Sequence, residues 1–283
     1  MNWERRSKIL FLSSAFTTAF IVAEMIIYVC RYLFGKPAGL NVIEQCSGWL
    51  TSNGYGWLVP ALDALVLYTL AAALWHVVRQ LRLSRQAARH FAGRINEERT
   101  ASLNRTYCGG RREVLVVDRE DAIALTMGFF RPQIVLSTGL LDMLQEEEAA
   151  AVIQHEIYHK RNRDPMKTAF MHICSAVFWY IPILRWCCSQ YRIARELLAD
   201  AYAIRNTGSA IGIGSALLKL MRHNQIRKYT FTYASFAETS INYRLQQMLE
   251  PEFDSFPKLP IKAAMVSIHS AAVVSAMLLA ELL

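Results

Sequence analysis

Two histidines four residues apart, with a glutamate directly after the first, are the residues of this chain best suited to chemistry. His155, Glu156 and His159 form an H-E-x-x-H segment within a stretch of helix-forming residues. Residues four apart lie on one face of an α-helix, so both imidazoles can bind one tetrahedral zinc ion. Glu156 lies one step around the helix, where its carboxylate can take a proton from metal-bound water and pass it to a leaving amine. The segment predicts a zinc peptidase site.

A pair of acidic residues about forty positions later supplies the rest of this site. Glu196 and Asp200 are also four apart on a predicted helix, so they share a face. Two histidines and Glu196 leave one position of a tetrahedral zinc open for water, and Asp200 can orient a ligand histidine from behind. The alternative is a core or surface helix that matches a five-residue pattern by chance.

The composition around the two histidines favours a helix that holds them. Acidic residues 146–148 open the segment, alanines 149–151 follow, and basic residues 160, 161 and 163 lie near its end. This order matches the helix macrodipole. We expect Pro165 to stop the helix.

Two short β-rich runs precede this helix. Glu113–Asp118 and Gln133–Ser137 are bounded by glycine or proline and predict a small sheet. We expect Gln133–Ser137 to be an exposed edge strand that binds the backbone of an extended substrate. The alternative is a purely structural strand.

Long apolar segments indicate a membrane protein. Hydrophobic residues make up 53% of the chain, and the mean hydropathy is +0.18. A membrane-spanning helix needs about 20 apolar residues. Residues 9–30, 57–78 and 261–283 meet this length. A signal peptide is the alternative for the first stretch, although it lacks a small-residue cleavage site.

Basic residues predict how these spans are oriented. They cluster before the first span and after the second, at Arg5, Arg6, Lys8, Arg79, Arg82, Arg85 and Arg89, whereas the loop between the spans has only Arg31 and Lys36. Both ends of this hairpin should therefore be cytoplasmic. We expect a transmembrane hairpin over 1–78, a cytoplasmic catalytic domain over 79–258 and a last span over 261–283. Contact with anionic lipids explains the net charge of +8, and no nucleic-acid-binding module is recognisable.

A further apolar stretch, Thr168 to Leu184, lies between the two halves of the metal site. A single membrane crossing there would put Glu196 on the opposite side from His155. The stretch is short and contains Pro182, so we expect a helical hairpin over about 166–186. It either dips into the membrane or forms a plain buried hairpin.

The motifs of this chain resemble a known family over roughly residues 55–283. They are Gly128–Ser137, Glu148–His159, Phe178–Pro182 and Arg195–Asp200, in that order. This set is similar to the membrane metallopeptidases of the BlaR/MecR antirepressor family, with related motifs in HtpX-type and CAAX prenyl-protein peptidases. The resemblance implies a mainly α membrane protein with an α+β zincin-like (gluzincin) domain inserted between transmembrane helices. It assigns zinc to His155, His159 and Glu196, and the role of catalytic base to Glu156.

Arg244 resembles an arginine that follows the acidic ligand in related peptidases. Such a cation could stabilise the negative charge that develops on the substrate oxygen. His223, Tyr202 and Tyr243 compete for this role, and an arginine on a helix surface is the alternative.

The family resemblance also implies a biological role. Expected substrates are a transcriptional repressor or the enzyme itself, cleaved at the cytoplasmic face of a bacterial cell membrane. A quality-control protease and a non-catalytic, zinc-stabilised receptor or scaffold are the alternatives. The chain ends at Leu283 without a penicillin-binding domain, so direct β-lactam sensing is not expected, and we expect the signal to come through the three spans or a membrane sensor partner. A homo-oligomer is also considered. Glu24 and Asp63, within the predicted spans, are candidates for signalling or for interfacial placement.

Overall fold

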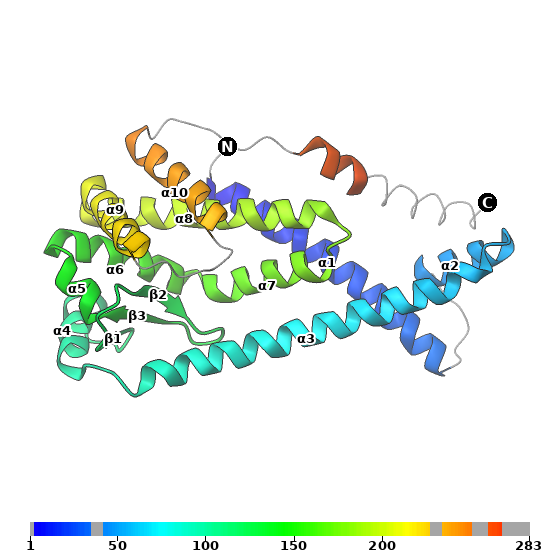
Figure 1. Cartoon of the computed structure of the whole chain (residues 1–283), viewed down its shortest axis with the longest axis horizontal. Helices are drawn as coiled ribbons and strands as arrows, with labels where there is room; N and C mark the ends of the chain where they lie inside the picture. Colours follow the sequence, from blue (N-terminus) through cyan, green and yellow to red (C-terminus); the bar gives the residue numbers. More distant parts are fainter. Residues whose placement is uncertain (1–2, 35–41, 227–233, 251–259, 268–283) are drawn as a thin grey trace. The chain divides into compact units, whose positions relative to one another are not determined.

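The structure is a computed structural model that describes residues 3–34, 42–226, 234–250 and 260–267 (Figure 1). It divides into two compact units that interleave along the sequence. Unit 1 comprises Met1–Ser7, Leu81–Ala169 and Tyr191–Phe256, and unit 2 comprises Lys8–Gln80, Phe170–Gln190 and Pro257–Leu283. Four of the described helices run from one unit into the other: α1 (Trp3–Phe34), α3 (Val59–Ala92), α7 (Asp164–Val177) and α8 (Pro182–Thr207).

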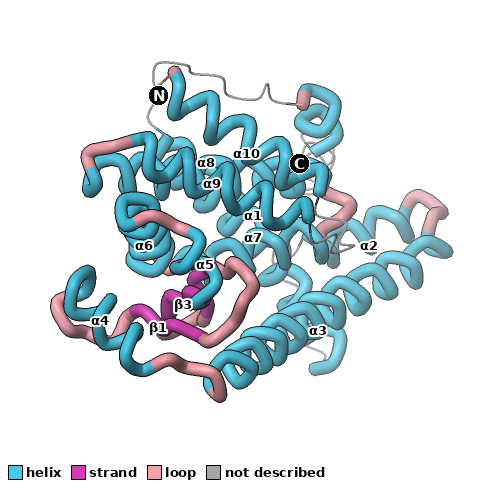
Figure 2. Tube along the Cα trace, turned by 60° about the vertical axis from the view of Figure 1, so that its left-hand side comes forward, coloured by secondary structure: helices cyan, strands magenta, loops and turns pink. Residues whose placement is uncertain are grey.

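Unit 1 contains a small sheet and most of the shorter helices. Its elements are the end of α3 (Val59–Ala92), α4 (Glu97–Cys108), β1 (Val114–Val117), β2 (Ala124–Met127), β3 (Gln133–Ser137), α5 (Thr138–Met143), α6 (Glu146–Arg161), the start of α7 (Asp164–Val177), most of α8 (Pro182–Thr207), α9 (Ala210–Ile226) and α10 (Ala234–Leu249). Figure 2 shows the short strands next to α5 and α6, and both helices contact β3.

The strand order β1-β3-β2 corrects the sequence prediction. Gln133–Ser137 is β3, which pairs in parallel with β1 and antiparallel with β2, so it is the central strand and not an edge. The expectation that this strand binds substrate along an open edge is therefore wrong, because both of its hydrogen-bonding sides are used. Among the described residues, the strand with an open side next to α6 is β2.

One apolar core joins the sheet to α6 and α9. Ile134 and Leu136 of β3 are fully buried against Ile153 and Ile157 of α6, together with Ile213 of α9. Close packing of α6 and α9 depends on Gly212, because a Cβ there would lie 3.1 Å from the main-chain oxygen of Glu147. With Ile153 and Ile157 in the core, His155 and His159 point to a different side of α6.

The predicted helix over the two histidines is present, but Pro165 does not end it. α6 ends at Arg161, and Arg163 then adopts a φ of 52°. Pro165 lies in the first turn of α7, where a missing N–H costs nothing because the first amides of a helix have no internal partner.

Unit 2 is built from long apolar helices. α1 (Trp3–Phe34) and α3 each contain a segment long and apolar enough to cross a membrane, within Trp3–Cys30 and Gly56–Ala92. Large side chains on both helices are exposed, including Phe16 and Leu74. Such exposure would be costly in water over two long helices and suits a lipid environment. Which side of a membrane each end faces stays a prediction.

The apolar stretch between the two halves of the metal site forms the expected helical hairpin. α7 ends at Val177 and α8 begins at Pro182, and within unit 2 the turn packs against the two long helices. Phe178 is buried with Ile21 and Val22 of α1, and the hydroxyl of Tyr180 lies 3.5 Å from Thr69 of α3. Whether the hairpin dips into a membrane or is a plain buried hairpin stays open.

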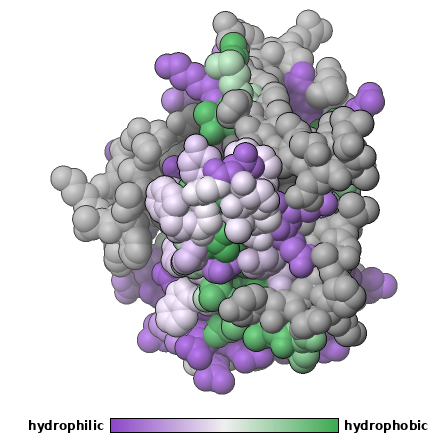
Figure 3. All heavy atoms as spheres, turned by 90° about the vertical axis from the view of Figure 1, so that its right-hand side faces the viewer, coloured by the Kyte–Doolittle hydropathy of each residue, from purple (hydrophilic) through white to green (hydrophobic). Residues whose placement is uncertain are grey.

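α2 (Val42–Ser52) and the short 3-10 helix η1 (Gly56–Leu58) connect the two long helices. Figure 3 views the end at which α2 lies, and many described side chains there are pale, which marks intermediate hydropathy. Trp49 and Tyr55 stack in this connection with ring centroids 6.4 Å apart. Aromatic side chains of this kind are typical of a membrane–water interface.

Within unit 2, the hydroxyl of Tyr28 donates a 2.6 Å hydrogen bond to Asp63 and links α1 to α3. The signalling role considered for Glu24 and Asp63 stays a prediction. Of the predicted last span, residues 261–267 are helical and the remainder lies outside the described residues.

Candidate metal centre

Three side chains from two helices of unit 1 meet in a group that fits a metal ion. α6 provides His155 and His159, and α8 provides Glu196. The two Nε2 atoms are 3.0 Å apart, and Glu196 lies 3.6 Å from each of them through its two oxygens. The histidine side chains are 8% and 9% exposed, whereas that of Glu196 is 31% exposed. The group is therefore accessible on the side of Glu196.

These separations match the edges of a tetrahedral site. Bonds of about 2.0–2.1 Å to zinc place neighbouring donors about 3.3 Å apart. The distances of 3.0 and 3.6 Å lie on either side of this value. The chemistry also fits, because two imidazole nitrogens and a carboxylate with one remaining coordination position are the donors of catalytic zinc sites.

The far nitrogen of His155 faces a carboxylate that is itself held by an arginine. Nδ1 of His155 lies 2.8 Å from Asp200, one turn after Glu196 on α8. Arg244 of α10 binds both oxygens of Asp200, with Nε and Nη2 donating at 2.7 and 2.8 Å. The carboxylate draws the imidazole proton to Nδ1, so Nε2 keeps its lone pair for a metal.

His159 has a second such arrangement that the sequence analysis missed. Its Nδ1 lies 2.8 Å from Asp164, and Arg195 forms an ion pair with the same oxygen of Asp164 at 2.9 Å. Asp164 is five residues after His159 and would not share its helical face. The turn at Arg163 brings it back, so only a prediction of where α6 ends could have found it.

Nδ1 of each histidine lies 2.8 Å from a carboxylate, and Nδ1 of His159 also lies 2.8 Å from Nη2 of Arg195. When the imidazole protons are on Nδ1, the two Nε2 atoms are acceptors that face each other across 3.0 Å. Two acceptors at this distance repel unless a cation lies between them. A divalent metal ion would satisfy both atoms.

The electrostatics of the group favour a cation at the same place. Burial lowers the pKa of His155, but Asp200 and Glu196 more than compensate and raise it to about 9. Burial raises the pKa of the Glu196 carboxyl, yet the neighbouring histidines and Arg244 hold it well below its usual range. The negative charges of Asp200 and Glu196 that raise the pKa of His155 also favour a divalent cation in this group.

Glu156 directly follows His155 on α6 and contacts the sheet. The hydroxyl of Thr126 on β2 donates to Oε2 of Glu156 at 2.7 Å, and it is 3.1 Å from the main-chain oxygen of the same residue. No local sequence pattern indicates this contact, because Thr126 precedes Glu156 by 30 residues and β2 was not predicted.

Arg244 is not on a helix surface. Its side chain is only 12% exposed, and Asp200 raises its pKa against the opposing effect of burial. Besides Asp200 it reaches Glu196, at 3.4 Å. Of the competing residues, Tyr202 accepts a hydrogen bond from Arg161, and in the described part of the chain no contact joins His223 or Tyr243 to the three donors.

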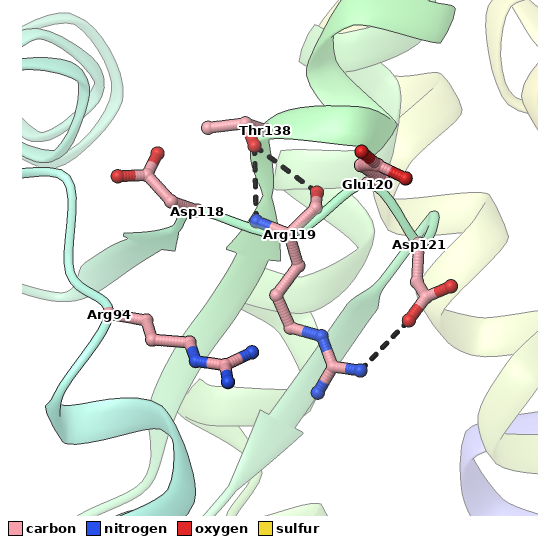
Figure 4. Close-up of a pocket in the computed structure, with 6 residues that line it drawn as sticks. All are labelled: Arg94, Asp118, Arg119, Glu120, Asp121 and Thr138. Carbon is pink, nitrogen blue, oxygen red and sulfur yellow. Dashed lines mark hydrogen bonds and ion pairs between the residues drawn. The ribbon is translucent and has the colours of Figure 1, made fainter.

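Unit 1 also has a polar hollow that is separate from this centre (Figure 4). Its volume is about 470 Å³, and it is lined by Arg94, Asp118, Arg119, Glu120, Asp121 and Thr138. Figure 4 shows Arg119 joined to Asp121 and to Thr138, so the charges partly neutralise one another. The hollow contains no histidine or cysteine, and the metal chemistry belongs to the group on α6 and α8.

Comparison with known proteins agrees with this geometry. Residues 46–248 match the family model described as BlaR1 peptidase M56, and this region contains every residue of the centre. The chain is also 23% identical over 122 residues to the Regulatory protein BlaR1 of Bacillus licheniformis. That similarity covers 42% of this chain and 20% of the relative, so the chain spans about a fifth of the relative's length. Because the family match extends over most of the chain and includes the metal centre, the chain belongs to the BlaR1 peptidase M56 family.

Proposed function

We propose that this protein is an integral membrane zinc endopeptidase that hydrolyses peptide bonds at the cytoplasmic face. The observation that carries the proposal is the triangle of donors formed by His155, His159 and Glu196, with Glu156 next to it. Membership of the BlaR1 peptidase M56 family supports the same chemistry. Its domain is zincin-like, with metal ligands on two helices and a small sheet alongside.

Each residue of the centre has a distinct task in this proposal. His155, His159 and Glu196 would hold zinc, which when bound acts as a Lewis acid and lowers the pKa of its water. Glu156 accepts a proton and later delivers it to the leaving nitrogen. Asp200 and Asp164 orient the two histidines through Nδ1. Arg244 is committed to Asp200 by two bonds, so we assign it to positioning rather than to the developing oxyanion.

The open side of β2 is the place where an extended substrate would pair. Next to the antiparallel pair of β2 and β3, Ser137 donates its N–H to the carbonyl of Ile123. From this register, Ala124 and Thr126 are in non-hydrogen-bonded pairs with β3 and direct their N–H and C=O groups to the open side. An added strand could bind these groups, and β2 takes the role that we expected for Gln133–Ser137.

The substrate we propose is a transcriptional repressor or the enzyme itself. The family match and the relative's description as a regulatory protein support regulatory proteolysis over general degradation. Two helices suitable for crossing a membrane, with arginines after the second, support a cytoplasmic catalytic unit. We propose no direct binding of nucleic acid, because the proposed hydrolysis needs only the metal centre and a peptide substrate.

Zinc content and cleavage of purified full-length protein test the proposal. We would compare the wild type with Glu156→Gln, Glu196→Ala and the control Glu147→Gln, which changes an exposed residue of the same helix. The assays are metal analysis after dialysis and cleavage of casein or of the protein itself. We expect Glu156→Gln to bind one zinc without cleaving, Glu196→Ala to lose zinc, and Glu147→Gln to match the wild type.

Two outcomes would overturn the proposal. If the wild-type protein bound no zinc, the assignment of a zinc site would be wrong. If Glu156→Gln cleaved as fast as the wild type, Glu156 would not be the catalytic base, and a zinc-stabilised scaffold would become the better account.

A further inference from the structure

Thr126 is the residue through which the sheet contacts Glu156. Its Oγ1 lies 2.7 Å from Oε2 of the carboxylate and 3.1 Å from the main-chain oxygen of Glu156. Glu156 is only 7% exposed, so little water competes for this bond. A hydroxyl has one proton and can donate to one of the two oxygens at a time.

We infer that Thr126 is a positioning residue for the base Glu156, holding its carboxylate in place through Oε2. The inference rests on the proposed peptidase activity. A hydrogen bond to a charged carboxylate is about twice as strong as a neutral one. The bond from Thr126 goes to Oε2, which leaves Oε1 to accept a proton from the attacking water.

The same residue also faces the proposed substrate. Its side chain points to α6, while the register of β2 and β3 directs its N–H and C=O to the open side of the sheet. A strand that pairs with β2 would be fixed relative to Thr126, and Thr126 fixes Glu156. Substrate backbone and base are thereby positioned by one residue, which would explain why this short strand lies so close to α6.

Thr126→Val and Thr126→Ser in the full-length protein test the inference. Valine has the shape of threonine without the hydroxyl, and serine keeps the hydroxyl. Thr106→Val, at an exposed threonine of α4, is the matched control. For each variant we would measure zinc content, kcat and KM on a peptide cleaved by the wild type, and affinity for that peptide in a Glu156→Gln background.

A misplaced catalytic group costs up to about a hundredfold in rate, so we expect Thr126→Val to lower kcat by about 10- to 100-fold. Zinc content, KM and peptide affinity should change by less than about threefold, because the metal ligands and the main chain of β2 remain. Thr126→Ser should restore most of kcat. In the Glu156→Gln background, Thr126→Val should not lower the residual rate further, because both changes act through one group.

Three results would overturn the inference. They are a kcat for Thr126→Val equal to that of Thr106→Val, a loss of zinc in Thr126→Val, and a failure of serine to restore the rate. If Glu156→Gln were as active as the wild type, the proposed function would fail instead, and that result is obtained independently of any Thr126 variant.

Discussion

At the scale of single residues, the metal centre repeats one unit twice. His155, Asp200 and Arg244 form one set, and His159, Asp164 and Arg195 form the other. In each set an arginine holds an aspartate that faces Nδ1 of a histidine. The arginine balances the charge of a buried aspartate, and burial of an unpaired carboxylate would otherwise be costly.

The two sets predict similar effects for Asp200→Asn and Asp164→Asn. An asparagine keeps the shape but loses the charge that directs the imidazole proton to Nδ1. Changes to such outer partners typically weaken metal binding by about 10- to 100-fold, and we expect a loss in this range for each variant. Competition with a chromogenic chelator measures it, with the exposed Asp142→Asn of α5 as the control. Wild-type zinc affinity in both variants would show that the aspartates do not orient the ligands.

At the scale of helices, a buried carboxylate bonds α6 to α9. Burial raises the pKa of Glu148, but bonds from Lys219, Ser215 and the Gln145 amide outweigh it and lower the pKa. A lowered pKa contributes stability above the ordinary value of about 4.3, and this stability is lost as the pH falls through the folded value.

Glu148→Gln should therefore destabilise the protein in a pH-dependent way. Bonds to a charged group contribute about 1.5–3 kcal/mol, so we expect a loss of this size in the free energy of unfolding at pH 7. The difference from the wild type should shrink at acidic pH, where Glu148 is protonated in both folded and unfolded chains. Thermal unfolding from pH 3.5 to 8 measures it, and a difference that does not depend on pH would contradict the assignment.

At the scale of strands, the sequence pattern predicted two of the three strands, β1 and β3. It wrongly placed β3, the central strand, at the edge of the sheet. β2 has only four residues, Ala-Leu-Thr-Met, without the β-branched run that marked β1 and β3. Strand order also depends on the parallel pairing of β1 with β3, which are separated in the sequence by β2, and local patterns do not contain this information. The helical ligands were predictable because residues four apart share a face, whereas Asp164 and Thr126 reach the centre through a turn and a sheet.

The register of β2 predicts that a proline has different effects on the open side of the strand and on the side that pairs with β3. Ala124→Pro removes an N–H on the open side, and Leu125→Pro removes one that β3 binds. One backbone hydrogen bond contributes about 1 kcal/mol, so Ala124→Pro should weaken peptide binding to Glu156→Gln protein at least roughly fivefold, with little change in Tm. Leu125→Pro should lower Tm markedly. Equal peptide affinity in Ala124→Pro and its parent would exclude the open side of β2 as the substrate site.

At the scale of the whole molecule, the chain alternates between two units, so the residues of the metal centre are far apart in sequence. The hairpin of α7 and α8 leaves unit 1 after Ala169 and re-enters it at Tyr191, which allows Glu196 to reach the histidines of α6. A change in unit 2 that shifts either helix would also act on Asp164 and Glu196, which lie on these two helices. In the proposed function, α7 and α8 are the route by which a signal at the membrane would reach the zinc site.

The orientation of the chain is the prediction on which that route depends. The arginines after the second predicted span should keep the catalytic unit in the cytoplasm, and the connection between α2 and η1 should face outward. We would introduce Asn53→Cys in the connection or Arg112→Cys in unit 1, both at exposed positions, and compare each with its parent chain. A membrane-impermeant maleimide should label Asn53→Cys in intact cells and Arg112→Cys only after permeabilisation. Labelling of Arg112→Cys in intact cells would put the metal centre outside, where a cytoplasmic repressor could not be its substrate.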